Sequence, residues 1–232
     1  MSVVDLLQIK DPSFLKELSI NELVELSKEI RTFLIENISK TGGHLSSNLG
    51  VVELTIALHY VFSSPTDKLI FDVGHQSYTH KILTGRAKDF KTLRQYKGLS
   101  GYIKRNESIH DIYEAGHSST SIAAAAGIEF SKKYTDSKGR VIPIIGDGAL
   151  TVGMAFEALN FLGGQKDHEP IIILNDNEMS ITDNIGYLSN ILNEIRGKSG
   201  YRKIKSNVSK LMPRFLRRLS SKVERGIKGI LT

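Results

Sequence analysis

Apolar positions along the chain alternate between helical spacing and short continuous runs. Ser19 and Glu22 have the S-x-x-E spacing of a capping box, and apolar residues follow at intervals of three and four, so a helix is expected to begin near Ser19. Further helices are expected over residues 51–62, 118–134 and 151–162. The glycine- and serine-rich residues 41–50 (TGGHLSSNLG) are expected to form a loop.

Three short apolar runs predict buried strands. They occupy residues 69–73, 141–145 and 171–174 (LIFDV, VIPII and IIIL). Continuous apolar strands that alternate with helices are typical of a parallel sheet covered on both faces. The sequence therefore predicts the α/β class, with a mostly parallel sheet, helices on both faces and right-handed crossovers.

Polar side chains follow the second and third of these strands. A Gly-Asp-Gly sequence centred on Asp147 follows one, and an Asn-Asp-Asn sequence from Asn175 to Asn177 follows the other. Because the carboxyl ends of parallel strands meet at one edge of a sheet, Asp147 and Asn175 are expected to lie close together. One carboxylate and one carboxamide form a sparse oxygen set, typical of Mg²⁺ shared with phosphate oxygens. The glycines beside Asp147 let a diphosphate approach the backbone.

Either tripeptide alone is also ordinary turn chemistry, and the pair is more specific than its members. Other nucleotide-binding motifs do not fit. The sequence has no G-x-x-x-x-G-K-[ST], and Thr151 stands where G-x-G-x-x-G requires its third glycine.

The charge of the chain is unevenly distributed. The 232 residues carry a net charge of +6, yet residues 196–232 contain 12 Lys and Arg against one Glu, and the remaining 195 residues carry −5. We therefore expect a domain over residues 1–195 and a basic amphipathic tail or linker over residues 196–232. The basic segment could lie on an anionic membrane surface, but a solvated linker is the favoured interpretation, and no motif supports a nucleic-acid partner.

The absence of cysteine excludes a disulfide framework, a cysteine-ligated metal and a cysteine nucleophile. The first residues lack the pattern of a secretory signal, and no apolar stretch is long enough to cross a bilayer, so a cytoplasmic location is expected.

Six segments resemble the 1-deoxy-D-xylulose-5-phosphate synthase family of thiamine-diphosphate enzymes, and they occur in that family's order. They are residues 42–55, 72–86, 96–105, 116–125, 146–160 and 174–181 (GGHLSSNLGVVELT, DVGHQSYTHKILTGR, YKGLSGYIKR, GHSSTSIAAA, GDGALTVGMAFEALN and LNDNEMSI). The resemblance implies a transketolase-like, thiamine-diphosphate-binding fold, here expected to be incomplete at its C-terminal end.

The resemblance also implies the cofactors and the residues that hold them. The cofactors are thiamine diphosphate and Mg²⁺, with Asp147, Asn175 and a carbonyl near Asn177 as metal ligands. The implied cofactor-binding residues are His75, Gly116, His117, Ser118, Gly148, Ala149 and Asn175. His44 and His75 are the implied catalytic residues, and a neutral imidazole can pass protons near physiological pH.

The other histidines are expected to lie outside the catalytic site or have no assigned role. His59 lies in an apolar helical run and is expected to be packed, whereas His110 and His168 lie in polar segments and are expected to be solvated. The role of His80, close to His75, is left open.

The family condenses pyruvate with glyceraldehyde 3-phosphate, with loss of CO₂, in the synthesis of isoprenoid, thiamine and pyridoxal precursors. Its enzymes are much longer than this chain and carry a further domain that holds the pyrimidine ring, and the resemblance suggests a homodimer. This chain is therefore expected to be inactive alone, either as one subunit that needs a second chain or as a truncated product. The alternatives are a transketolase-type half-subunit with a different ketol substrate and a non-catalytic remnant.

Overall fold

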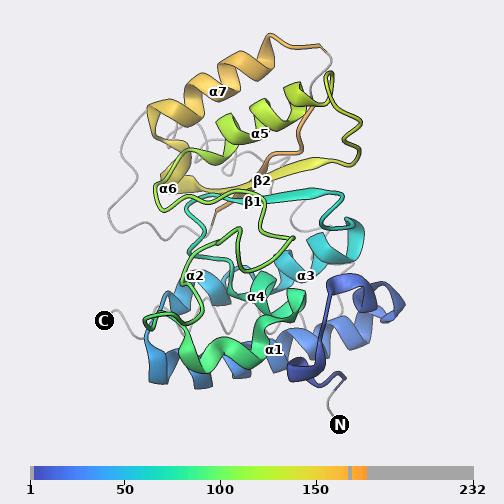
Figure 1. Cartoon of the computed structure of the whole chain (residues 1–232), viewed down its shortest axis with the longest axis vertical. Coiled ribbons are helices and arrows are strands. Elements are labelled where there is room, and N and C mark those ends of the chain that lie inside the picture. Colours follow the sequence, from blue (N-terminus) through green and yellow to red (C-terminus); the bar gives the residue numbers. More distant parts are fainter. Residues whose placement is uncertain (1–2, 167–168, 177–232) are drawn as a thin grey trace, which may run out of the picture. The chain divides into compact units, whose positions relative to one another are not determined.

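The computed structural model describes residues 3–166 and 169–176 (Figure 1). These residues belong to the first of the two units into which the chain divides, Met1–Thr182. The expected boundary near residue 196, the basic segment 196–232, His168 and Asn177 lie outside the described residues.

Within the described residues three parallel strands form a sheet, which confirms the expected α/β class. They are β1 (Lys68–Phe71), β2 (Val141–Gly146) and β3 (Ile173–Asn175), and they lie side by side in the order β1-β2-β3. Phe71 pairs with Ile144, and Gly146 pairs with Asn175. The third strand therefore begins two residues later than its apolar run, and it includes Asn175.

The expected helices are present, with shorter ones between them. They are α1 (Ile20–Thr41), α2 (Leu45–Leu49), α3 (Val52–Val61), α4 (Tyr78–Lys81), α5 (Ser121–Ser131), α6 (Asp147–Leu150) and α7 (Gly153–Gly163). The described residues also form the 3-10 helices η1 (Leu6–Gln8), η2 (Pro12–Glu17) and η4 (Ala87–Thr92) and the π-helical turn η3 (Ile82–Arg86). The capping box of α1 is confirmed, because Ser19 N–H donates to the Glu22 carboxylate at 2.8 Å and Glu22 N–H donates to Ser19 Oγ at 3.4 Å.

The loop expected over residues 41–50 was wrong in part, because α2 lies within it. Leu45 and Leu49 pack against the large apolar cluster that α1 supplies with Leu26, Ile30 and Leu34. This tertiary contact stabilises a helical turn that the glycine- and serine-rich composition does not indicate.

Helices cover both faces of the sheet, as expected (Figure 1). Leu58 of α3 packs with Leu69 and Phe71, whereas Ala125 of α5 packs with Ile70, which points to the opposite face. The second helix of that opposite layer, α7, lies against α5. The sheet is thereby buried between two helical layers. The edge formed by the carboxyl ends of its strands is where a ligand is expected to bind.

A buried ion cluster fixes the irregular segment that follows the η4 turn. Arg86 donates from two nitrogens to the carboxylate of Asp111 at 2.7 and 2.8 Å, and His80 Nε2 lies 3.0 Å from the same group. Lys81 and Arg86 both donate to the neighbouring Glu107. Burial raises the pKa of the Asp111 carboxyl, but hydrogen bonds from His80 and Arg86 outweigh burial and hold the pKa below its usual range.

The carboxylates of this cluster also bind backbone. Ser100 N–H donates to Glu107 at 2.8 Å, and Lys104 N–H donates to Asp111 at 3.1 Å. Tyr102 lies between these two anchors. The cluster therefore determines where Tyr102 lies.

His110 is buried rather than solvated, so that expectation was wrong. Its Nδ1 lies 2.9 Å from the hydroxyl of Ser64, which is 46 positions away, and the polar sequence around His110 gives no sign of this contact. The packed position of His59 is confirmed, since its side chain is buried and its Nε2 lies 2.9 Å from His80 Nδ1.

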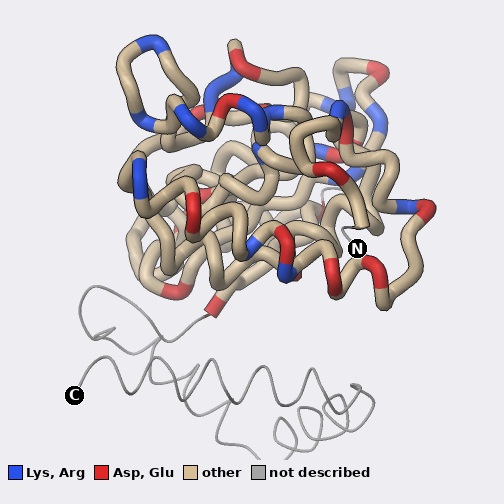
Figure 2. Tube along the Cα trace, turned by 90° about the horizontal axis from the view of Figure 1, so that it is seen from below, with Lys and Arg blue, Asp and Glu red and all other residues tan. Residues whose placement is uncertain are grey.

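Charged residues of both signs are interspersed over the described part of the chain (Figure 2). Within that part, no helix combines the length and the apolar character needed to span a membrane.

Candidate functional site

The carboxyl ends of the three strands bring polar residues to one edge of the sheet. Asp72 follows β1, Asp147 follows β2, and Asn175 ends β3. Because Gly146 pairs with Asn175, the chain reaches Asp147 directly beside the end of β3. The side chain of Asp147 is largely buried, and Asn175 is half-buried.

Asp72 binds the start of α5. Its two carboxylate oxygens accept the backbone N–H groups of Ser119 at 2.8 Å and Ser121 at 3.0 Å, and its side chain is 1% exposed. These bonds also explain why α5 begins at Ser121 and not at Ser118, since Ser119 is held at a φ of +77°. Asp72 therefore holds Ser119, which directly follows residues 116–118, at the same edge.

Ser119 connects this segment to the region after β2. Its hydroxyl accepts the backbone N–H of Ala155 at 2.8 Å and donates to the carbonyl of Val152 at 3.3 Å. Gly148 and Ala149 lie in α6, which directly precedes these residues. The structure thus joins Ser119, which follows the Gly116–His117–Ser118 segment, to the residues that follow α6.

Several polar groups at the start of α5 are unpaired. The buried hydroxyls of Thr120 and Ser121 have no hydrogen-bond partner among the described residues. Gly116 has open space where a side chain would stand, and His117 is exposed. These are groups that an anionic ligand could use, since a buried hydroxyl without a partner is destabilising.

His44 and His75 form a pair. Their rings meet edge to face with centroids 5.4 Å apart, and the ring of Tyr102 lies 5.6 Å from that of His44. Both histidines carry a buried Nδ1 that lacks a partner among the described residues. His75 lies three positions beyond Asp72, so the pair belongs to the same edge of the sheet.

The environment keeps both imidazoles neutral near pH 7. Burial lowers the pKa of His44, and the positive charge of Arg94 lowers it further. Burial also lowers the pKa of His75, with a smaller contribution from His44 and an opposing one from Asp72. Neutral rings with one free nitrogen can accept a proton or a hydrogen bond from a ligand.

Backbone strain concentrates around these residues. Val73 has a φ of +63°, a conformation that a β-branched residue rarely adopts, and it stands between Asp72 and the turn that leads to His75. Arg94 and Ser119 also have positive φ values, +63° and +77°. Strain of this kind persists where surrounding contacts enforce it, and it is common at functional sites.

The donor set suits the cofactors that the sequence implies. Within the described ranges, no group of three or more His, Cys, Asp or Glu could hold a metal ion. Asp147 and Asn175 instead offer one carboxylate and one amide, which suits Mg²⁺ that keeps phosphate and water ligands. The unpaired hydroxyls and imidazole nitrogens fit a polar, anionic cofactor at the same edge.

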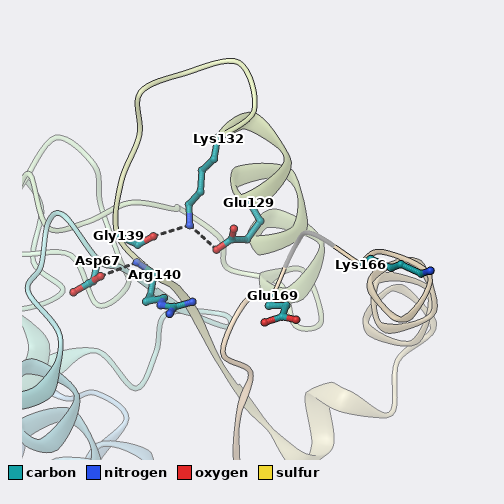
Figure 3. A pocket seen from close by; sticks show the side chains of 7 residues that line it. All are labelled: Asp67, Glu129, Lys132, Gly139, Arg140, Lys166 and Glu169. Atoms are coloured by element: carbon teal, nitrogen blue, oxygen red, sulfur yellow. Dashed lines mark hydrogen bonds and ion pairs between the residues drawn. The ribbon is translucent and has the colours of Figure 1, made fainter.

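An open cavity of about 590 Å³ lies at the other end of the sheet (Figure 3). Asp67 and Arg140 directly precede β1 and β2, and Lys132 of the α5 end donates to Glu129 and to the carbonyl of Gly139, both at 2.6 Å. The cavity is lined by Asp67, Glu129, Lys132, Gly139, Arg140, Lys166 and Glu169. None of the site residues expected from the sequence contributes to it.

The sequence prediction overlooked Asp72, Asn48 and Ser119. A signal for Asp72 was present, because it follows an apolar run as Asp147 does. Nothing in the sequence around Asn48 or Ser119 indicates their long-range contacts, such as those of Asn48 with His75 and of Ser119 with Ala155, which span 27 and 36 positions.

Comparison with known proteins agrees with these features. The family model described as 1-deoxy-D-xylulose-5-phosphate synthase matches residues 6–232. A 1-deoxy-D-xylulose-5-phosphate synthase from Listeria innocua is 56% identical over 234 residues, which cover 98% of this chain and 37% of the relative. One from Macrococcus caseolyticus is 62% identical over 205 residues, which cover 88% of this chain and 32% of that relative. One from Bacillus cytotoxicus is 59% identical over 209 residues, which cover 90% of this chain and 33% of that relative.

The chain thus spans about a third of the length of the curated relatives it matches. The match extends over nearly all of this chain, and the motifs that form the edge of the sheet lie within it. The chain belongs to the 1-deoxy-D-xylulose-5-phosphate synthase family.

Proposed function

We propose that this chain forms the diphosphate- and Mg²⁺-binding part of a 1-deoxy-D-xylulose-5-phosphate synthase. The complete enzyme would join two carbons of pyruvate to glyceraldehyde 3-phosphate and release CO₂, in the supply of isoprenoid, thiamine and pyridoxal precursors. The observation that carries the proposal is the convergence of Asp72, Asp147 and Asn175 at the carboxyl ends of three adjacent parallel strands.

Asp147 and Asn175 would hold the metal. Asp147 supplies the charge that attracts a divalent cation, and Asn175 supplies a neutral oxygen, so two phosphate oxygens can complete the set without excess negative charge. The third ligand proposed from the family, a carbonyl near Asn177, lies outside the described residues.

The diphosphate would lie between two glycine-containing segments. Gly116, His117 and Ser118, which precede the Ser119 that Asp72 binds, would contact it from one side, and Gly148 and Ala149 of α6 would contact it from the other. Unpaired hydroxyls of Thr120 and Ser121 add donors. Backbone N–H groups and hydroxyls bind phosphate without adding a competing charge.

His44 and His75 would serve the reacting end. Bound thiamine diphosphate supplies the nucleophilic carbon and the electron sink for decarboxylation of a 2-keto acid. The neutral rings can then accept a proton at Nδ1 or Nε2 and return it during the addition and release steps. His75 would contact the cofactor, and His44 would face the substrate.

The chain alone is proposed to be inactive, because it spans 37% of the Listeria innocua relative and the family resemblance implies a pyrimidine-binding domain beyond the part that it matches. A second chain or further domains would supply that part. Phe130, Met154 and Phe161 line an apolar groove of about 480 Å³ between α5 and α7, which supports contact with a second subunit in a homodimer. The cytoplasmic location stays a prediction from the sequence.

Calorimetric titration tests the cofactor site. Thiamine diphosphate is titrated into the 232-residue chain with Mg²⁺, and again with EDTA in place of Mg²⁺. Binding that requires Mg²⁺ is expected. Equal heats with and without the metal, or no binding in either, would contradict the proposed site.

An activity assay tests the need for further domains. The chain is assayed for pyruvate-dependent formation of deoxyxylulose phosphate, alone and mixed with a second chain that carries the remaining part of the Listeria innocua relative. Activity is expected only in the mixture. Turnover by the chain alone would show that the proposal of inactivity is wrong.

A further inference from the structure

Asn48 connects the two candidate catalytic histidines. Its side-chain Nδ2 donates to the backbone carbonyl of His44 at 2.7 Å and to that of His75 at 2.8 Å. Its Oδ1 accepts the backbone N–H of Tyr78 at 2.8 Å. The side chain is fully buried.

The three contacts fix the orientation of this amide. Two carbonyl oxygens face the nitrogen that carries two hydrogens, and one N–H faces the oxygen, so the opposite orientation would place an oxygen against both carbonyls. Asn48 thus uses both of its donors and one acceptor position. A side chain that satisfies its partners this fully has little freedom to move.

Neither histidine is held in place by hydrogen bonds of its own Nδ1. His44 is the N-cap of α2 and makes no side-chain capping bond, and the Nδ1 atoms of His44 and His75 lack partners among the described residues. His75 follows Val73 and Gly74, which have φ values of +63° and +89°. The relative position of the two rings therefore depends on the backbone at His44 and His75.

We propose that Asn48 is a positioning residue that holds His44 and His75 at a fixed separation. It joins the segment before α2 to the turn after β1, which lie 27 positions apart, and it does so at the carbonyl of each histidine. Because the rings act on one ligand under the proposed function, on which this inference rests, their separation matters more than the position of either alone. The side chain of Asn48 is fully buried and bonds to the backbone of both histidines, so Asn48 would act through them.

The test compares histidine rings within one sample. The full 232-residue chain is labelled with ¹⁵N-histidine, and the ring resonances of His44, His75, His59 and His80 are followed from pH 8 to pH 5. In Asn48→Ala, the His44 and His75 resonances are expected to shift, and both pKa values are expected to rise toward the ordinary value of about 6.5 as water enters. The resonances of His59 and His80, which bind each other in the core, should stay in place.

Asn37→Ala is the matched control. Asn37 also donates from Nδ2 to a backbone carbonyl, that of Phe33 at 2.8 Å, but it does so within α1 and contacts neither histidine. This variant removes the same chemical group and should leave all four ring resonances unchanged.

Asn48→Ser gives a second measurement if Asn48→Ala does not fold. A serine hydroxyl within a helix can donate to the carbonyl four positions earlier, here that of His44, but it is too short to reach His75 as well. The expected result is a shift of the His75 ring that exceeds the shift of the His44 ring. Unchanged His44 and His75 resonances in a folded Asn48 variant, or equal shifts of all four rings, would overturn the proposal.

A kinetic readout applies once an active mixture is found. Misplaced catalytic groups lower kcat, so Asn48→Ala should reduce kcat by about 10- to 100-fold while the KM for pyruvate changes little. The ring resonances are measured without cofactor or substrate. If the rings respond but thiamine diphosphate never binds, the proposed function fails, and what stands is that Asn48 fixes the relative position of the two rings.

Discussion

The carboxylate of Asp72 accepts the backbone N–H of Ser119 at 2.8 Å, across 47 positions of sequence. With its second bond, to Ser121, it attaches the first helix of one layer to the end of the first strand. Ser119 then contacts Ala155 at the start of α7. A single buried carboxylate therefore fixes the relative positions of three elements around the candidate cofactor site.

Asp72→Asn should destabilise the fold. The amide oxygen can still accept one N–H group, but its NH₂ group would face the other, leaving a buried donor unsatisfied at a loss of about 1–3 kcal/mol. The free energy of unfolding in urea, followed by circular dichroism, measures the loss.

Asp67→Asn is the control for this change. Asp67 also accepts two backbone N–H groups, from Ser63 at 2.6 Å and Arg140 at 2.7 Å, but it is half-buried, so water can replace a lost bond. Asp67→Asn should therefore lower the free energy of unfolding less than Asp72→Asn does, by below about 1 kcal/mol. An equal loss in the two variants would show that burial of Asp72 is not the cause.

Asp147→Ala should remove Mg²⁺-dependent cofactor binding. Without the carboxylate the proposed site has only neutral ligands, and the affinity for thiamine diphosphate in the presence of Mg²⁺ should fall by more than about 10-fold. Glu157→Ala, which removes an exposed carboxylate from α7, is the control and should bind as the unaltered chain does. Titration calorimetry measures both, and an unchanged affinity in Asp147→Ala would exclude it as a metal ligand.

Acid should destabilise the protein through His80. Burial lowers the pKa of His80 to about 4, against the opposing effect of Asp111. An unfolded histidine has a pKa near 6.5, so between about pH 6.5 and pH 4 the unfolded chain binds a proton at this position that the folded chain does not. The free energy of unfolding should therefore fall as the pH falls through this window, by up to about 1.4 kcal/mol per pH unit from this group.

His80→Gln removes the titrating group and should flatten this dependence, even if the variant is less stable at pH 7. Urea unfolding at several pH values between 7 and 5 gives the slope of unfolding free energy against pH for the unaltered protein and for His80→Gln. The buried His59 has a pKa lowered in the same direction by burial, so some dependence should persist. Identical slopes in the two proteins would contradict the assignment to His80.

Two glycine substitutions should have opposite effects. Gly85 has a φ of +90°, and an added Cβ would lie 2.6 Å from the carbonyl oxygen of Lys10, so Gly85→Ala should destabilise by about 1–3 kcal/mol. Gly127 lies within α5 with open space around it, so Gly127→Ala should stabilise by about 0.5–1 kcal/mol. Thermal unfolding should show the melting temperature falling for Gly85→Ala and rising for Gly127→Ala, and any other order would contradict the geometry.

Local patterns in the sequence determined the elements and the class of fold. The capping box of Ser19 and Glu22 depends on residues three positions apart, and the apolar runs of β1 and β2 are continuous, so both could be predicted without tertiary information. The meeting of Asp147 and Asn175 was also predictable, because parallel strands joined by one crossover end at the same edge. The family motifs indicated His44, His75 and the residues 116–118.

Only the tertiary structure decided how these residues are held. The anchoring by Asp72, the bridge through Asn48 and the buried ion cluster of Arg86 and Asp111 join positions from 25 to 49 apart. A local pattern carries no information about such contacts, because they depend on which chain segments the packed core brings together. For the same reason α2 and the burial of His110 were missed: in each case a distant contact outweighed the local preference of a polar sequence.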